Sequence, residues 1–192
     1  MTKSHNFKSL TLHKLIQKNK FFIFLLTLFC ISNLKAQEPS IFDIARNGTL
    51  IELKQIIKTD ADIINLISKK GYSALTLACY YGNNEVAKYL IRHVKDVNSK
   101  SSYGTPLMAA TVKKNIYLVR LLLENKANPN LTDKNNSTAL HFSVIFGLEE
   151  IIKLLVKYQA NPNIKDNRGN TALDYSKIIN NNNIIKLLKT KK

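Results

Sequence analysis

The side chains able to carry out chemistry are few and lie far apart in this sequence. Outside residues 1–36 it contains two histidines and one cysteine, His93, His141 and Cys79. They belong to three different segments, whereas the ligands of a metal site must lie close together. No paired carboxylates, phosphate-binding glycine loop or Ser, His and Asp set accompanies them. We therefore expect a non-enzymatic protein with no catalytic residue, no metal and no cofactor.

Structural roles account for these side chains. His93 lies near the end of a predicted helix, where a contact with the helix dipole explains it. Cys79 takes a small-residue position inside a predicted helix, which favours a buried thiol over a reactive one. The remaining candidates are carboxylates near predicted loops, where turn and cap roles are typical: Asp43, Asp96, Asp133 and Asp166.

The elements around these side chains repeat with a period of 33 residues. Thr105, Thr138 and Thr171 stand 33 residues apart, and Ser73 lies 32 before the first of them. A fixed period in this range predicts stacked repeats. Thirteen residues after each Ser or Thr comes an apolar doublet with a second pair three residues on: Val86-Ala87 and Tyr89-Leu90, Leu118-Val119 and Leu121-Leu122, Ile151-Ile152 and Leu154-Leu155, Ile184-Ile185 and Leu187-Leu188. A third mark closes three of the units: Asp96-Val-Asn98, Asn128-Pro-Asn130 and Asn161-Pro-Asn163.

Capping and stop signals predict two helices in each unit. Thr105 is placed to cap a helix, and Pro106 takes the first helical position, where its missing N–H costs nothing. Gly82 and Gly147 end the first helix of their units. Gly48 is expected to end the first helix of the chain in the left-handed conformation.

These motifs resemble the ankyrin repeat. The matching stretches are Gly169-Asn-Thr-Ala-Leu173, Thr105-Pro-Leu-Met-Ala-Ala110, Thr138-Ala-Leu-His141 and Ala160-Asn-Pro-Asn163. The resemblance covers roughly residues 41–190. It implies an all-α solenoid of stacked helix-turn-helix pairs with hairpin-like loops, and it implies that His141 makes hydrogen bonds within and between repeats. The expected units are about 41–68, 69–100, 101–133, 134–166 and 167–192.

The chain departs from the ankyrin pattern at several glycine positions. Lys114 and Asn180 stand where a glycine is expected between the two helices of a unit. Val94, Lys126 and Gln159 replace the later glycine. We expect a somewhat irregular stack of the same fold.

The N-terminus has the order of a secretory signal peptide. Five lysines precede the apolar stretch 21–31, and small residues lead to Ala36. An 11-residue apolar core is short for a membrane-spanning helix, which needs about 20 residues. We expect residues 1–36 to be removed, with 37–40 as a short linker before the repeat domain 41–192. The ending before Gln37 resembles signal peptides of Bacteroidetes-type bacteria and predicts a periplasmic or extracellular protein; an uncleaved membrane anchor is the alternative.

The charge of the chain is strongly positive but unevenly placed. The formal net charge is +16, and residues 1–36 hold six lysines and no acid, which leaves 23 − 13 = +10 for residues 37–192. The sequence has no Arg-rich run and no helix with a basic stripe, so nucleic acid is not an expected partner.

Apolar residues exceed what stacking needs at the end of each first helix. Seven and eight residues after the capping Ser or Thr stand Tyr80-Tyr81, Val112-Lys113, Ile145-Phe146 and Ile178-Ile179. In ankyrin-like stacks these positions face the concave side; the alternative is that one of each pair packs on the next repeat. Predicted loop tips add Lys69, Lys70, Tyr72, Tyr103, Lys134 and Arg168. The candidate partner-binding residues are Tyr72, Tyr80, Tyr81, Tyr103, Lys113, Ile145 and Phe146.

Two functions fit this sequence. The favoured one is an exported, monomeric module that binds a protein partner through its concave face and loop tips. The alternative is an effector or an accessory subunit that regulates or protects a secreted enzyme, for example an oxidative-stress enzyme, a role that some bacterial ankyrin proteins resemble. The sequence does not name the partner, because repeat scaffolds carry unrelated partners on one fold.

Overall fold

The computed structural model describes residues 39–101 and 104–189. These residues belong to one compact unit, Pro39–Lys192. The predicted signal peptide and linker residues 37 and 38 lie outside the described residues, as does Tyr103. The described helices are α2 Ile41–Asn47, α3 Leu50–Thr59, η1 Ala61–Asn65, α4 Ala74–Tyr81, α5 Asn84–His93, α6 Pro106–Val112, α7 Ile116–Glu124, α8 Ala139–Ile145, α9 Glu149–Lys157, α10 Ala172–Ile178 and α11 Asn182–Lys189. The all-α prediction is confirmed.

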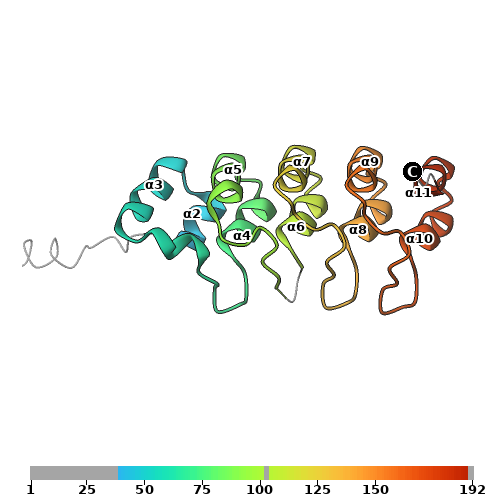
Figure 1. Ribbon diagram of the computed structural model, residues 1–192, viewed down its shortest axis with the longest axis horizontal. Helices are drawn as coiled ribbons and strands as arrows, with labels where there is room; N and C mark the ends of the chain where they lie inside the picture. The colour runs from blue at the N-terminus through green and yellow to red at the C-terminus, as the bar shows by residue number, and fades with distance from the viewer. Residues whose placement is uncertain (1–38, 102–103, 190–192) are drawn as a thin grey trace, which may run out of the picture. The chain divides into compact units, whose positions relative to one another are not determined.

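The α-helices form five consecutive pairs in the described part of the chain. The first helix of each pair packs on the first helix of the next, and the second helices pack on one another in the same way. We call α2, α4, α6, α8 and α10 the inner helices and α3, α5, α7, α9 and α11 the outer helices. In Figure 1 the inner helices lie between the outer helices and the hairpin-like loops. This arrangement is the predicted solenoid.

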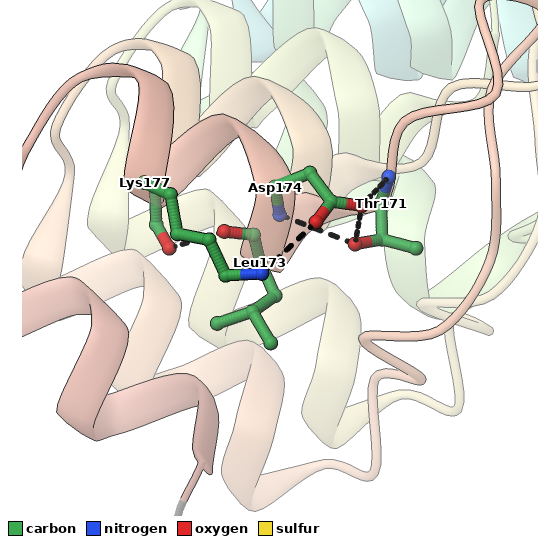
Figure 2. Close-up of polar contacts among 5 residues, drawn as sticks. Thr171, Leu173, Asp174 and Lys177 are labelled. Carbon is green, nitrogen blue, oxygen red and sulfur yellow. Dashed lines mark hydrogen bonds and ion pairs between the residues drawn. The ribbon is translucent and has the colours of Figure 1, made fainter.

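Side-chain caps start the inner helices at the predicted residues. The hydroxyl of Ser73, like those of Thr105, Thr138 and Thr171, accepts a hydrogen bond from the backbone N–H three residues later. At Thr171 the cap is reciprocal, because the Asp174 carboxylate accepts from the Thr171 N–H and hydroxyl (Figure 2). Such boxes satisfy backbone donors that the helix itself leaves unpaired.

Left-handed residues turn the chain between the helices of four pairs. Gly82 and Gly147 have φ of 74° and 66°, as predicted. Lys114 and Asn180 adopt the same conformation, with φ of 58° and 51°, although they carry side chains. The fold therefore imposes this turn even where the sequence lacks glycine.

Gly48 ends α2 as predicted, but the prediction of a left-handed conformation there is wrong. Gly48 is extended, with φ −81° and ψ 176°, and its N–H donates to the Ile44 carbonyl. A Cβ at this position would lie 2.6 Å from the Ile44 Cα. Glycine is required here by a close backbone approach and not by a left-handed turn.

The core lies between the two helix layers. The outer helices contribute residues of their apolar doublets, and among the inner helices α4 contributes most of its residues. The largest fully buried side chains are Ile41, Ile44, Leu53, Leu75, Leu90, Leu107, Leu118, Leu122, Leu140, Ile152, Leu155 and Ile184. Within residues 39–101 and 104–189, no helix combines the length and the apolar character needed to cross a membrane.

Asparagines link the loops of successive pairs. The side-chain carbonyl of Asn98 accepts from the Asn128 N–H at 2.7 Å, and that of Asn130 accepts from the Asn161 N–H at 2.6 Å. The first of these bonds joins the loop after α5 to the loop after α7, and the second joins that loop to the loop after α9. The recurring asparagines of the sequence therefore hold neighbouring repeats in register.

Candidate functional site

The last residues of the inner helices are the exposed part of those helices. In α4, residues 74–79 are buried because they pack between α2 and α6, whereas Tyr80 and Tyr81 are 47% and 51% exposed. Ile145 and Phe146 are exposed at the end of α8, and Ile178 and Ile179 are exposed at the end of α10. Val112 is half-buried and Lys113 is exposed. Large apolar groups thus reach solvent at the same place in three repeats.

A groove of about 500 Å³ lies against the inner helices of the first four pairs. Three of the predicted residues, Tyr72, Tyr80 and Tyr81, line it. Ile145 and Phe146 do not line the groove, although Phe142, one turn earlier in α8, does. The full lining is Arg46, Lys70, Tyr72, Thr76, Leu77, Tyr80, Tyr81, Met108, Ala109, Val112 and Phe142.

The sequence did not lead us to predict the groove residues that lie one turn earlier in the inner helices α4, α6 and α8. Leu77, Ala109 and Phe142 each stand four residues after the capping Ser or Thr, and they line the groove. Tyr80 and Val112 follow three residues later, which is the spacing of neighbours on one helix face. The helical period, extended one turn back from the predicted pairs, would have found these residues.

Ring contacts hold Tyr80 in place. The rings of Tyr80 and Tyr81 meet edge to face, with centroids 5.4 Å apart and planes at 73°. The Lys113 Nζ lies 5.0 Å from the Tyr80 ring centroid. Both contacts are geometries that aromatic rings favour. The predicted site residue Lys113 therefore joins the tyrosines from the neighbouring helix α6.

Two positive side chains line the groove. Arg46 and Lys70 line it, and no aspartate or glutamate is among its lining residues. Arg46 forms an ion pair with Asp43 at 3.0 Å. The Ser40 hydroxyl, which donates to the Asp43 carboxylate, and the Arg46 guanidinium hold the pKa of Asp43 below its ordinary value. The lining of the groove is thus mostly apolar and carries two basic side chains and no acidic one.

The comparisons with known proteins agree with this architecture. A family model described as ankyrin repeats (three copies) matches residues 41–133 and again residues 112–192. The chain belongs to the ankyrin repeat family. Ankyrin repeats generally mediate protein–protein interactions.

Similar ankyrin repeat proteins occur in distant organisms. An ankyrin repeat-containing protein of Treponema pallidum (strain Nichols) is 37% identical over 93 residues, which cover 48% of this chain and 31% of the relative. The ankyrin repeat protein YahD of Escherichia coli (strain K12) is 37% identical over 112 residues, 55% of each chain. A rat protein with ankyrin repeats and a SAM domain is 32% identical over 105 residues, 54% of this chain and 12% of its own length. The chain spans about half or less of the length of these relatives.

His141 links two ankyrin repeats, as the family resemblance implied. Its Nδ1 accepts from the Thr138 N–H at 3.1 Å, so Nε2 carries the proton and donates to the Asn170 carbonyl at 3.3 Å. Thr138 belongs to the cap of α8, whereas Asn170 precedes α10 in the next repeat. The ring is buried and also meets Tyr175 edge to face. These bonds give His141 a structural role.

The other chemically capable side chains are engaged in structure as well. Cys79 is fully buried in α4, and burial raises the pKa of its thiol. His93 stacks on Tyr89 with ring centroids 3.9 Å apart, and its Nδ1 lies 2.7 Å from the Tyr89 carbonyl oxygen. Asp133 accepts from the N–H groups of its own loop. Across the described ranges, no three His, Cys, Asp or Glu side chains come together as a metal site.

Proposed function

We propose that this protein is an exported, non-enzymatic ankyrin repeat module that holds a protein partner through the inner-helix ends and the loop tips. The observation that carries the proposal is the exposure of large apolar groups, Tyr80, Tyr81, Ile145 and Phe146, on a protein whose core is already complete. Exposed apolar patches of this kind mark interaction sites. Aromatic anchors beside a groove are the composition of binding hot spots.

Export is proposed from the pattern of the N-terminus. Basic residues, the apolar stretch 21–31 and the small residue Ala36 support cleavage at or near Gln37. The intact mass of the protein recovered from the native cell tests this step. A chain that begins at Gln37 in the periplasm or the medium is expected, and a chain that keeps residues 21–31 in the membrane fraction contradicts export.

Binding is tested by capture of partners with matched variants. Tyr81→Ala and Phe146→Ala should each weaken capture about tenfold or more, because truncation of an aromatic anchor typically costs about 2 kcal/mol. Tyr117→Ala is the control, since Tyr117 is an aromatic residue of similar exposure, 44%, on the outer helix α7. A protein that is captured by the wild type and the control, but not by either site variant, is the partner. If that partner is a secreted enzyme, the module is its accessory subunit.

Thermal unfolding of the same variants separates binding from folding. Tyr81→Ala and Phe146→Ala should melt close to the wild type, because neither side chain is buried. If both variants melt early and still capture the partner normally, these residues belong to the core and the proposed site is wrong.

A further inference from the structure

Acidic side chains are unevenly distributed between the two sides of the repeat stack. Eight lie on the outer helices or in the first half of the segments that follow them: Glu52, Asp60, Asp62, Glu85, Asp96, Glu124, Glu149 and Glu150. The inner helices and the second half of the loops that precede them hold the other four described carboxylates, Asp43, Asp133, Asp166 and Asp174. The inner side therefore contributes little negative charge of its own.

Each inner-side carboxylate is already bonded within its own repeat. Asp43 accepts from Ser40 and Arg46. Asp133 and Asp166 accept from backbone N–H groups of their loops. Asp174 accepts from the Thr171 cap and from Lys177. Asp43 thus pairs with Arg46 of the groove, and none of the four carboxylates forms an ion pair with Lys70 or Lys113.

One lysine that lines the groove and one lysine beside it lack a carboxylate partner. Lys70 lines the groove, and Lys113 extends over Tyr80 at its side. Among the described residues neither lysine forms an ion pair, in contrast to Arg46, which bonds to Asp43. These two lysines are thus available to an external anion at the groove.

The other side chains that line the groove are mostly apolar. Leu77 and Met108 contribute buried side chains, and the rings of Tyr80 and Tyr81 stand exposed beside them. A volume of about 500 Å³ has room for a bulky apolar side chain. A fitting ligand must supply an apolar group at the centre and negative charge around it.

We propose that the groove binds an acidic segment of the partner protein in which carboxylates flank a bulky apolar side chain. The apolar side chain packs against Leu77, Met108 and Tyr81, and the carboxylates lie near Lys70 and Lys113. Charge complementarity favours this ligand over a neutral peptide. The buried aliphatic side chains of Leu77 and Met108 favour an apolar side chain at the centre of the ligand. This inference rests on the proposed function and names the chemistry of the partner.

Three labelled peptides test the inference with the mature protein. The first places one Phe between Glu and Asp residues, the second replaces each acid by its amide, and the third replaces Phe by Ala. Fluorescence anisotropy should show that the first peptide binds about tenfold more tightly than either other peptide. Its affinity should also fall as salt is raised, because salt screens exposed charges.

Two charge-reversal variants provide the matched comparison. Lys70→Glu with Lys113→Glu should weaken binding of the acidic Phe peptide by about tenfold or more. Lys58→Glu with Lys157→Glu changes the net charge of the protein equally, but both residues lie on outer helices, α3 and α9. That control should bind within about twofold of the wild type, because the altered charges lie away from the groove. Circular dichroism melts establish that both variants are folded.

Several outcomes overturn the inference. Equal binding of the acid and amide peptides removes the selection for charge, and equal binding of the Phe and Ala peptides shows a general polyanion surface. If both charge-reversal variants weaken binding equally, the peptide binds outside the groove. If the acidic Phe peptide does not bind, the ligand has a different chemistry. The proposed function is contradicted separately, when Tyr81→Ala and Phe146→Ala capture the native partner normally.

Discussion

The inner and outer helices bury their residues in different ways. The inner helix α4 has 8 residues and buries the first six, because helices on both sides and an outer helix cover it. The outer helix α5 has 10 residues and buries only Val86, Ala87, Leu90 and Ile91, which form one stripe. Packing in the core therefore explains an apolar residue on most of an inner helix. It does not explain an apolar residue at the exposed last turn. The difference marks the inner-helix ends as the place to look for a ligand.

The largest expected effect compares two isoleucines of the fourth pair. Ile152 on the outer helix α9 is 0% exposed, and Ile145 at the end of the inner helix α8 is 44% exposed. Ile152→Ala should lower the free energy of unfolding by about 3 kcal/mol, because it leaves a cavity in the core. Ile145→Ala should cost less than about 1 kcal/mol. Urea unfolding measures both, and equal losses would show that the inner-helix end belongs to the core.

Two histidines give a polar version of the comparison. His141 lies in the first turn of the inner helix α8 and is buried, whereas His93 ends the outer helix α5 and is exposed. His141→Ala leaves the Thr138 N–H and the Asn170 carbonyl without their partner and should cost about 1–3 kcal/mol. His93→Ala should stay within about 0.5 kcal/mol of the wild type. A similar melt for both variants would contradict the role of His141 between repeats.

The turn after an inner helix offers a gain in stability. Lys114 has a left-handed backbone, a conformation that costs a residue with a side chain about 1–2 kcal/mol. Lys114→Gly should therefore raise the free energy of unfolding by up to about 1 kcal/mol. Lys113→Gly is the comparison and should lower stability, because Lys113 has φ −81°, so glycine there relieves no strain, adds flexibility and removes the contact with Tyr80. Stabilisation by both changes, or by neither, would contradict strain at Lys114.

The smallest effect concerns acid stability at the last inner helix. Hydrogen bonds from the Thr171 hydroxyl and N–H, and then the bond from Lys177, lower the pKa of Asp174 to about 2 (Figure 2). The ionised carboxylate is the form that is bonded in the folded state. Its contribution is thus present above its unfolded pKa of about 3.9 and is lost as the pH falls toward about 2.

Asp174→Asn tests this assignment. The melting temperature of the variant should be lower than that of the wild type at neutral pH and should fall less between about pH 4 and pH 2. Lys177→Gln should keep most of the wild-type pH dependence, because Thr171 supplies the largest contribution to the shift. If Lys177→Gln removes the pH dependence and Asp174→Asn does not, the cap is not its source.

The sequence determined the fold and the positions of most helix ends. Three patterns can be recognised directly in the sequence: the period of 33 residues, the capping Ser and Thr residues, and the apolar doublets of the outer helices. Each depends on the local sequence and not on contacts between distant residues. Pro106 starts α6 and Gly82 ends α4, as expected. At Gly48 the helix end was predicted correctly but the left-handed conformation was not found, because a close approach to the Ile44 backbone is a contact that local stop signals do not reveal.

The tertiary structure decided which of the candidate residues come together. Tyr72, Tyr80 and Tyr81 share a groove because stacking places α2, α4 and α6 side by side, while Ile145 and Phe146 lie beyond its lining. Met108 of α6 also lines the groove. Its side chain is buried, so the sequence spacing alone does not distinguish it from an ordinary core residue. The left-handed turn at Lys114 was likewise imposed by packing, because the geometry between stacked pairs outweighs the preference of one residue.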